Sequence, residues 1–351
     1  MNNLLKDLLI SDGISGYEEN ISKLIISNLS KICDENKIDK FGNVVCSIGK
    51  GKKKIMICAH MDEVGMIVKH INNKGYIFFS KIGGINDSIL PGKIVNIINK
   101  KGKRIVGIIG TKPPHLMSDE EFKKPINYKN MFIDIGVYSK KNVLKTLDIG
   151  DQIIFEPKIG KLNNNVYYGK SVDNRIGCYA LIKILEKLKK EEDIGAKIYA
   201  CATAQEEVGL KGAKVSSFNI NPDFALILDT TIAGDTPGIE EKDSSLKIGK
   251  GVAITIIEAS GRGTIIPRKI RNFIIETAQI NKIPHQIDII NGGVTDGAVV
   301  YMNRSGILTG ILSIPTKYIH APISVFNIKD INATIKLAVK IIKSIATSNI
   351  I

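Results

Sequence analysis

The chain has 351 residues, of which 44% are hydrophobic, and this is enough for a substantial core, so a disordered protein is excluded. The net charge of +14 is compatible with nucleic acid as a partner, but the lysines are spread along the chain and no aromatic residues interleave with their short runs, so we expect no nucleic-acid binding. No stretch reaches the roughly 18 apolar residues of a membrane span, so we expect no membrane partner. The five cysteines contain no CxxC pair, so we expect them to be free thiols in the reducing cytoplasm.

The first part of the chain predicts a helix followed by two strands. Apolar residues within 17–33 recur at spacings of three and four, which is typical of a helix with one buried face. Short apolar runs at 44–48 and 55–58 predict strands, and the second run leads directly to His60.

From about residue 68 to residue 165 the pattern changes to short apolar runs, some of them separated by turn signals, without a long helical period. The predicted strands are 77–79, 94–98, 104–109, 131–137 and 152–155. This pattern predicts a small β-rich domain.

Strands and helices alternate again after residue 168. The predicted elements are helices at 176–188 and 270–280 and strands at 198–203, 224–228, 252–257 and 307–314. The alternation predicts an α/β domain whose sheet is flanked by helices. We expect this domain to comprise residues 1–67 and 166–351, interrupted by an insert of residues 68–165.

Potential metal ligands lie where the predicted strands end or, in one case, just before a predicted helix. In open α/β sheets such positions meet at the carboxyl edge, where ligands bind. Imidazole and carboxylate groups suit zinc, cobalt and manganese, and the set is large enough for two divalent ions and one spare carboxylate. The candidates are His60, Asp173, Glu206, Glu207, Asp229 and His320.

The adjacent Glu206 and Glu207 are expected to have different roles, because neighbouring side chains diverge. One would be a ligand and the other the general base for a bound water. Asp62, two residues after His60, is placed to orient the imidazole. Taken alone, Asp173 could cap a helix and Asp229 could form a turn, but the joint placement at strand ends favours a metal site.

Six motifs occur in the order AHMDEVG, DNRIG, QEEVGLKGA, LDTTIAGDTPG, GGVTDGA and KYIHAP. In these motifs and their order the chain resembles the glutamyl aminopeptidase and tetrahedral aminopeptidase family of two-metal peptidases, over essentially its whole length. One departure is GGVTDGA, where the family commonly has a GGTDAGA-like segment followed by a stretch that contains histidine; this difference bears on the substrate pocket.

The resemblance implies a metallopeptidase domain with a central mixed sheet flanked by helices, interrupted by a β-barrel-like insert that serves in dimerisation. It implies a homo-oligomer built from dimers, with a dodecamer as the larger candidate, because family members often form twelve-subunit tetrahedral particles. It also assigns roles: His60 and Asp229 to one metal, Glu207 and His320 to the other, Asp173 as the bridge, Glu206 as general base and Asp62 as support for His60.

The predicted function is therefore that of a cytoplasmic aminopeptidase that removes N-terminal residues from peptides through metal-activated water. The expected cofactors are two divalent ions per subunit, zinc or cobalt, with manganese as a further candidate. The alternatives are another metal-dependent amide hydrolase and a glycosidase that uses paired carboxylates, although a glycosidase would leave the histidines unexplained. A nucleic-acid-binding protein would rest on the charge alone.

Overall fold

The computed structural model describes residues 1–191 and 193–347. The chain forms two compact units: the first comprises Met1–Asp62, Lys158–Ile319 and Ile323–Ile351, and the second comprises Glu63–Pro157 and His320–Pro322. No helix within the described ranges is long and apolar enough to cross a membrane.

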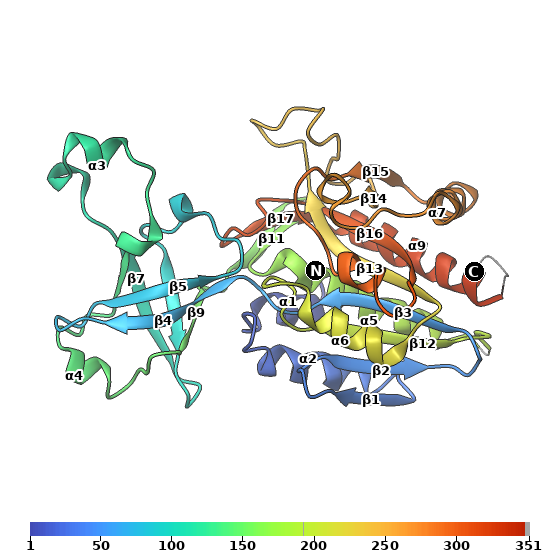
Figure 1. The fold of residues 1–351 in the computed structure, drawn as a ribbon, viewed down its shortest axis with the longest axis horizontal. Coiled ribbons are helices and arrows are strands. Elements are labelled where there is room, and N and C mark those ends of the chain that lie inside the picture. Colours follow the sequence, from blue (N-terminus) through green and yellow to red (C-terminus); the bar gives the residue numbers. More distant parts are fainter. Residues whose placement is uncertain (192, 348–351) are drawn as a thin grey trace. The chain divides into compact units, whose positions relative to one another are not determined.

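The first unit is built around a mixed sheet of 11 strands (Figure 1). The strands are β1 (Glu35–Ile38), β2 (Val44–Ile48), β3 (Lys54–His60), β10 (Ile159–Asn163), β11 (Val166–Gly169), β12 (Lys197–Thr203), β13 (Phe224–Ile232), β14 (Val252–Ile257), β15 (His285–Ile289), β16 (Leu308–Lys317) and β17 (Ser324–Asn327). Their order is β1-β2-β12-β3-β13-β16-β17-β11-β10, and β14 joins β15 to β16.

The centre of this sheet is parallel, since β12 and β13 both run parallel to β3, and β16 runs parallel to β13. These strands are almost completely buried, in keeping with their nearly continuous apolar sequences. The strands of a parallel sheet have nearly continuous apolar sequences because helices cover both faces of the sheet. Parallel pairing also gathers the carboxyl ends of the strands at one edge.

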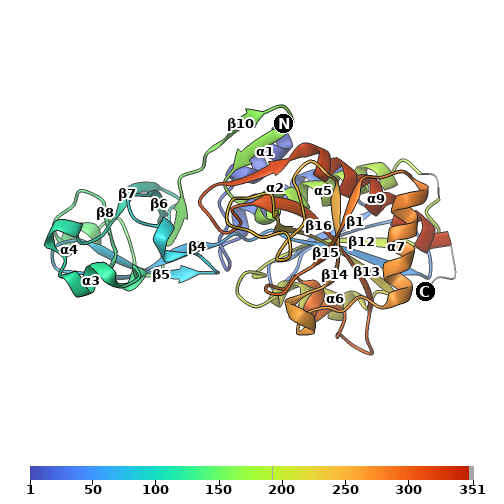
Figure 2. The same cartoon turned by 90° about the horizontal axis from the view of Figure 1, so that it is seen from above.

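Helices cover the sheet on both faces. The helix α5 contacts β3, β13 and α9, whereas α6 contacts β12 and β3 from the opposite face (Figures 1 and 2). The helices of this unit are α1 (Asn3–Ile10), α2 (Glu19–Leu29), α5 (Val172–Leu188), α6 (Lys211–Ile220), α7 (Arg268–Ile280), α8 (Gly297–Val300), α9 (Ile328–Thr347) and the 3₁₀ turn η4 (Ala259–Gly261).

The second unit contains a closed six-stranded barrel with its own apolar core, which includes Val68, Ile97, Ile133 and Ile153. Closure leaves no free strand edge. The strands follow the order β4-β5-β8-β7-β6-β9. The elements are β4 (Gly65–Ile71), β5 (Ile77–Ile82), β6 (Ile94–Ile98), β7 (Arg104–Gly110), β8 (Phe132–Asp134), β9 (Gln152–Phe155), the helices α3 (Asp119–Lys123) and α4 (Lys140–Val143), and the 3₁₀ turns η1 (Asp87–Ile89), η2 (Pro114–Leu116) and η3 (Tyr128–Asn130).

The predicted fold class is confirmed: a mixed sheet flanked by helices accompanies a small barrel of the insert segment. Two predicted elements are longer than the observed ones. The strand expected at 131–137 ends at Asp134, because Gly136 turns the chain with φ +71°. The helix expected at 17–33 ends at Leu29, whose carbonyl oxygen accepts from Ile32 and Cys33 in a tight turn.

Candidate metal centre

The register of the parallel strands brings four of the predicted side chains to the same edge of the sheet. Thr203, the last residue of β12, lies opposite His60, the last residue of β3. Ile227 of β13 lies opposite Cys58, so Asp229 and His60, each two residues further on, lie at the same level. The turn after β12 carries Glu206 and Glu207.

His60 is the centre of a group of carboxylates. Its Nε2 atom lies 3.1 Å from Asp173 Oδ1, 3.5 Å from Asp229 Oδ1 and 4.0 Å from Glu206 Oε2. Ligand atoms of His60, Asp173 and Glu207 all lie within 4.8 Å of one another, and so do those of His60, Glu206 and Asp229. We call His60, Asp173, Glu206, Glu207 and Asp229 the carboxylate–histidine cluster.

The donor set of this cluster fits divalent cations. One imidazole nitrogen and several carboxylate oxygens converge from a sheet edge, a helix start and a turn, which is a set that zinc, cobalt or manganese accepts. The side chains of His60 and Asp229 are 2% and 7% exposed, so the donors are held in a largely dry site. Such a convergence of negative charge is costly without a counter-charge.

In the metal-free protein this cost shifts the pKa values of the clustered side chains. Burial, with the nearby Asp229 and Glu207, raises the pKa of Glu206 well above its usual value, and burial likewise raises the pKa of Asp229. Burial opposes a charge on His60, but the surrounding carboxylates of Glu206 and Asp229 outweigh it, so the pKa of His60 is raised well above its ordinary range. The cluster therefore favours the uptake of protons or of a cation.

Asp62 has more partners than the sequence suggested. His60 Nδ1 lies 3.2 Å from the backbone oxygen of Asp62 and 3.6 Å from its Oδ1. The carboxylate accepts hydrogen bonds from the hydroxyl of Ser15 and from the backbone N–H groups of Glu206 and Glu207. Asp62 thus connects the imidazole to the turn that carries the two glutamates.

His320 lies in the other unit of the chain, with residues 63–157. Its Nδ1 atom is 3.2 Å from the backbone oxygen of Gly84. Its assignment as a metal ligand therefore stays a prediction that rests on the resemblance of its motif.

Asp296, which lies in the GGVTDGA motif, is a buried carboxylate near the cluster and was not among the predicted site residues. It is 1% exposed, and its Oδ2 accepts from Thr203 Oγ1 at 2.6 Å and from Cys58 Sγ at 3.4 Å. Burial raises the pKa of Asp296 to about 7. The GGVTDGA motif was the sequence signal for this residue, but the motif was related only to the substrate pocket.

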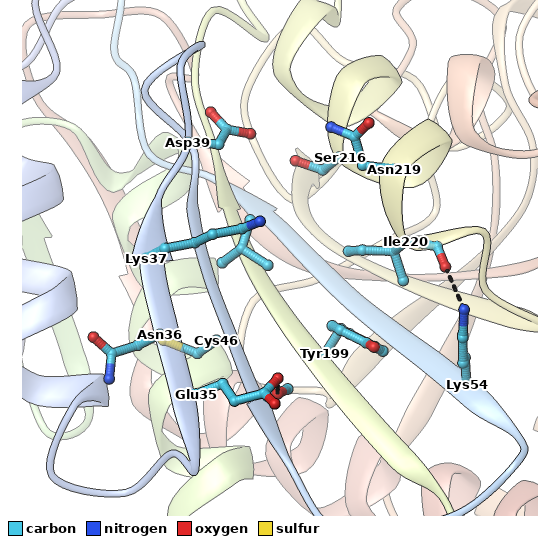
Figure 3. A pocket seen from close by; sticks show the side chains of 12 residues that line it. Glu35, Asn36, Lys37, Asp39, Cys46, Lys54, Tyr199, Ser216, Asn219 and Ile220 are labelled. Carbon is cyan, nitrogen blue, oxygen red and sulfur yellow. Dashed lines mark hydrogen bonds between the residues drawn. The ribbon is translucent and has the colours of Figure 1, made fainter.

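A separate cavity of about 440 Å³ lies in the first unit between the strands β1, β2 and β12 and the helix α6 (Figure 3). Figure 3 shows Lys37 reaching across it from β1, and Lys54 Nζ donates to the backbone oxygen of Ile220 at its rim. None of the cluster's side chains lines this cavity. It is therefore distinct from the candidate metal centre.

Comparisons with known proteins agree with one another. Residues 42–337 match the family model described as M42 glutamyl aminopeptidase. The lysyl aminopeptidase of Pyrococcus furiosus is 34% identical over 339 residues, which cover 95% of this chain and 94% of the relative.

Two solved structures share the fold over nearly the whole chain. A TET aminopeptidase from a marine sediment archaeon of the Thaumarchaeota has a TM-score of 0.93 at 34% identity and covers 97% of this chain and 95% of its own. The TET1 peptidase of Pyrococcus horikoshii, which can assemble into a tetrahedron or a large octahedral shell, has a TM-score of 0.86 at 33% identity, with 96% and 97% covered.

Proposed function

The chain belongs to the M42 glutamyl aminopeptidase family, as its motifs predicted, and on this premise we propose that it is a di-metal aminopeptidase that removes N-terminal residues from peptides. Membership makes the protein a hydrolase of the peptidase class. The observation that carries the di-metal mechanism is the convergence of His60 with four carboxylates at the edge of the parallel sheet.

We propose that His60 and Asp229 would hold one ion and Glu207 and His320 a second, with Asp173 as a ligand that both ions would share. The 3.1 Å contact between His60 and Asp173 supports the bridge, since both would face the same ion. Zinc or cobalt, with manganese as a further candidate, would suit this donor set. When bound, such ions supply a water of lowered pKa and polarisation of the scissile carbonyl.

The remaining chemistry belongs to the side chains. Glu206 takes a proton from the attacking water and returns it to the leaving amine. Its 9% exposure supports this role, because a proton held there is shielded from bulk solvent until the amine departs. Asp62 accepts from the N–H groups of Glu206 and Glu207 and so keeps the base and the adjacent ligand in place.

Membership of the family also bears on the alternative function. A glycosidase with paired carboxylates is not favoured, because a histidine lies at the centre of the cluster and the family is one of aminopeptidases.

We propose a homo-oligomer, based on dimers formed through the insert of residues 68–165 and extending to a dodecamer. The assembling TET1 relative supports this, and a cytoplasmic location stays a prediction.

The test is hydrolysis of a panel of aminoacyl-p-nitroanilides by chelator-treated protein, before and after zinc, cobalt or manganese is added. The panel should include glutamyl and lysyl substrates, because the family and the Pyrococcus furiosus relative carry these names. We expect no cleavage without metal and restored cleavage with at least one metal. Full activity of the rigorously metal-free protein would contradict the mechanism, and no activity with any metal would contradict the function.

A further inference from the structure

The turn that carries Glu206 and Glu207 is held by carboxylates from two distant parts of the chain. The backbone N–H of Gln205 donates to Glu18 Oε1 at 3.0 Å. The next two N–H groups, of Glu206 and Glu207, donate to Asp62 Oδ1 at 3.0 Å and Oδ2 at 3.2 Å. Three consecutive backbone donors are thus fixed by two buried acids.

Glu18 and Asp62 are connected through residues 15–18, which we call the N-terminal clamp. Glu18 is 7% exposed, and its Oε1 also accepts from the N–H of Gly16 at 2.8 Å. Ser15, at the other end of the clamp, donates its hydroxyl to Asp62 Oδ2 at 2.6 Å. The clamp therefore contains one of the two acids that hold the turn and contacts the other.

The residues just before the clamp are anchored beside Asp173, another member of the cluster. Arg175, which is 0% exposed and lies two residues after Asp173, donates from Nη1 to the backbone oxygens of Leu8 at 2.9 Å and Ser11 at 3.0 Å. Its Nη2 donates to the oxygen of Gly13 at 3.3 Å. The segment thus joins the start of α5, the end of β3 and the turn after β12.

The turn needs such support because of its backbone. Gln205 has φ +57°, in the left-handed region that residues with a side chain rarely adopt. A strained residue keeps this conformation only when its surroundings impose it. The hydrogen bond from Gln205 to Glu18 acts at the strained residue itself, immediately before Glu206.

We propose that Glu18 is a positioning residue for the peptidase reaction: by accepting the N–H of Gln205 it holds the strained turn that aims Glu206 at the attacking water. The role rests on the proposed function, in which Glu206 is the general base. Glu18 does not belong to the cluster and acts only through the backbone of Gln205. A positional error of the order of 1 Å in a reacting group costs about 100-fold in rate, so the expected effect lies in kcat.

The test compares three substitutions of Glu18 with one neighbouring control, using the metal-loaded enzyme. E18A should lower kcat about 10- to 100-fold with KM nearly unchanged. E18Q should retain most of kcat, because its amide oxygen can accept the same two N–H groups. E18D should lose kcat as E18A does, because its oxygen is withdrawn by one methylene group although the charge remains. The control E19A removes an exposed carboxylate from the first turn of α2 and should match the wild type.

Hydrogen–deuterium exchange gives a readout that is independent of activity. Peptides covering residues 203–210 should exchange faster in E18A and E18D, but not in E18Q or E19A, while peptides of β13 stay protected in all variants. Should E18A fail to fold, E18D provides the same comparison.

Two results would overturn the proposal: wild-type kcat and exchange in E18D, or a loss in E18Q as large as in E18D. A wild type that cleaves no substrate with any metal would refute the proposed function, whereas the exchange comparison would still decide whether Glu18 holds the turn.

Discussion

Replacing Glu206 by Gln separates the general base from the metal ligands. The substitution keeps the size of the side chain and removes its capacity to take a proton. The cluster offers no substitute base, because its other carboxylates are proposed ligands. Asp62, next to the cluster, is fully buried, and its oxygens accept from Ser15 and two backbone N–H groups. We therefore expect kcat to fall by about 10³- to 10⁴-fold, the upper part of the range for a general base, or about 4–5 kcal/mol in the barrier.

The same substitution should leave metal content nearly intact, because His60, Asp173, Glu207 and Asp229 remain. It should also stabilise the metal-free protein at neutral pH, since it removes a buried acid that lies beside Asp229 and Glu207. A gain of about 1 kcal/mol would raise the melting temperature of a chain of this length by about 1–2 °C.

The assay measures kcat with the best nitroanilide substrate, metal content by plasma emission spectrometry and melting of the chelated protein by calorimetry. The exposed Glu276 provides a matched control, as E276Q makes the same chemical change on the outer face of α7. Wild-type kcat in E206Q would refute the assignment of the base. Loss of metal together with activity would instead show that Glu206 is a ligand, which its 4.0 Å distance from His60 makes a definite alternative outcome.

Three further predictions concern the support of the site and the core. D62A should lower metal affinity or kcat about 10- to 100-fold, because the turn loses two acceptors and the hydroxyl of Ser15 loses its partner; unchanged values in metal titration and kinetics would contradict this. The chelated protein should melt at lower temperature as the pH rises from about 5 to about 8. Burial raises the pKa of Glu206 and Asp229, and it raises the pKa of Asp296 to about 7, so the native state binds more protons than the unfolded state. The stability that these bound protons contribute is lost as they dissociate. A melting temperature that rises over this range would show the sign to be wrong. I57A, at a fully buried position in β3, should lower the free energy of unfolding by about 2–5 kcal/mol in denaturant titrations, and a loss below about 1 kcal/mol would contradict the packing observed there.

Local patterns in the sequence were sufficient for the elements whose burial is periodic or continuous. The observed bounds of β2, β6, β9 and β14 coincide with the predicted ranges. The missed elements have weaker signals or depend on distant partners: β1 is exposed along its whole length, and β17 is a strand because it pairs with β11 and β16. The helix α9 did carry a readable signal, since Ile331, Ile335, Ile342 and Ile345 recur at helical spacing on its buried face.

The α5 helix shows where periodicity misleads at the position of a proposed metal ligand. The prediction began it at residue 176, whereas the observed element begins at Val172 and includes non-helical dihedral angles at Asp173 and Asn174. The irregular start places Asp173 beside His60 instead of on a helix face. An apolar pattern records which side of a regular element is buried, so it contains no information about such a local departure.

The sequence by itself determined the α/β class, the family and the residue types of the site, because burial periodicity and ordered motifs are local properties of the chain. The tertiary structure alone decided how those residues are held. Gln205 and Glu18 are 187 residues apart in sequence, and Glu206 and Asp62 are 144 apart, yet their hydrogen bonds define the turn of the proposed base. A hydrogen bond depends on distance and direction in space, and no spacing along the chain specifies either until the sheet has brought the segments together.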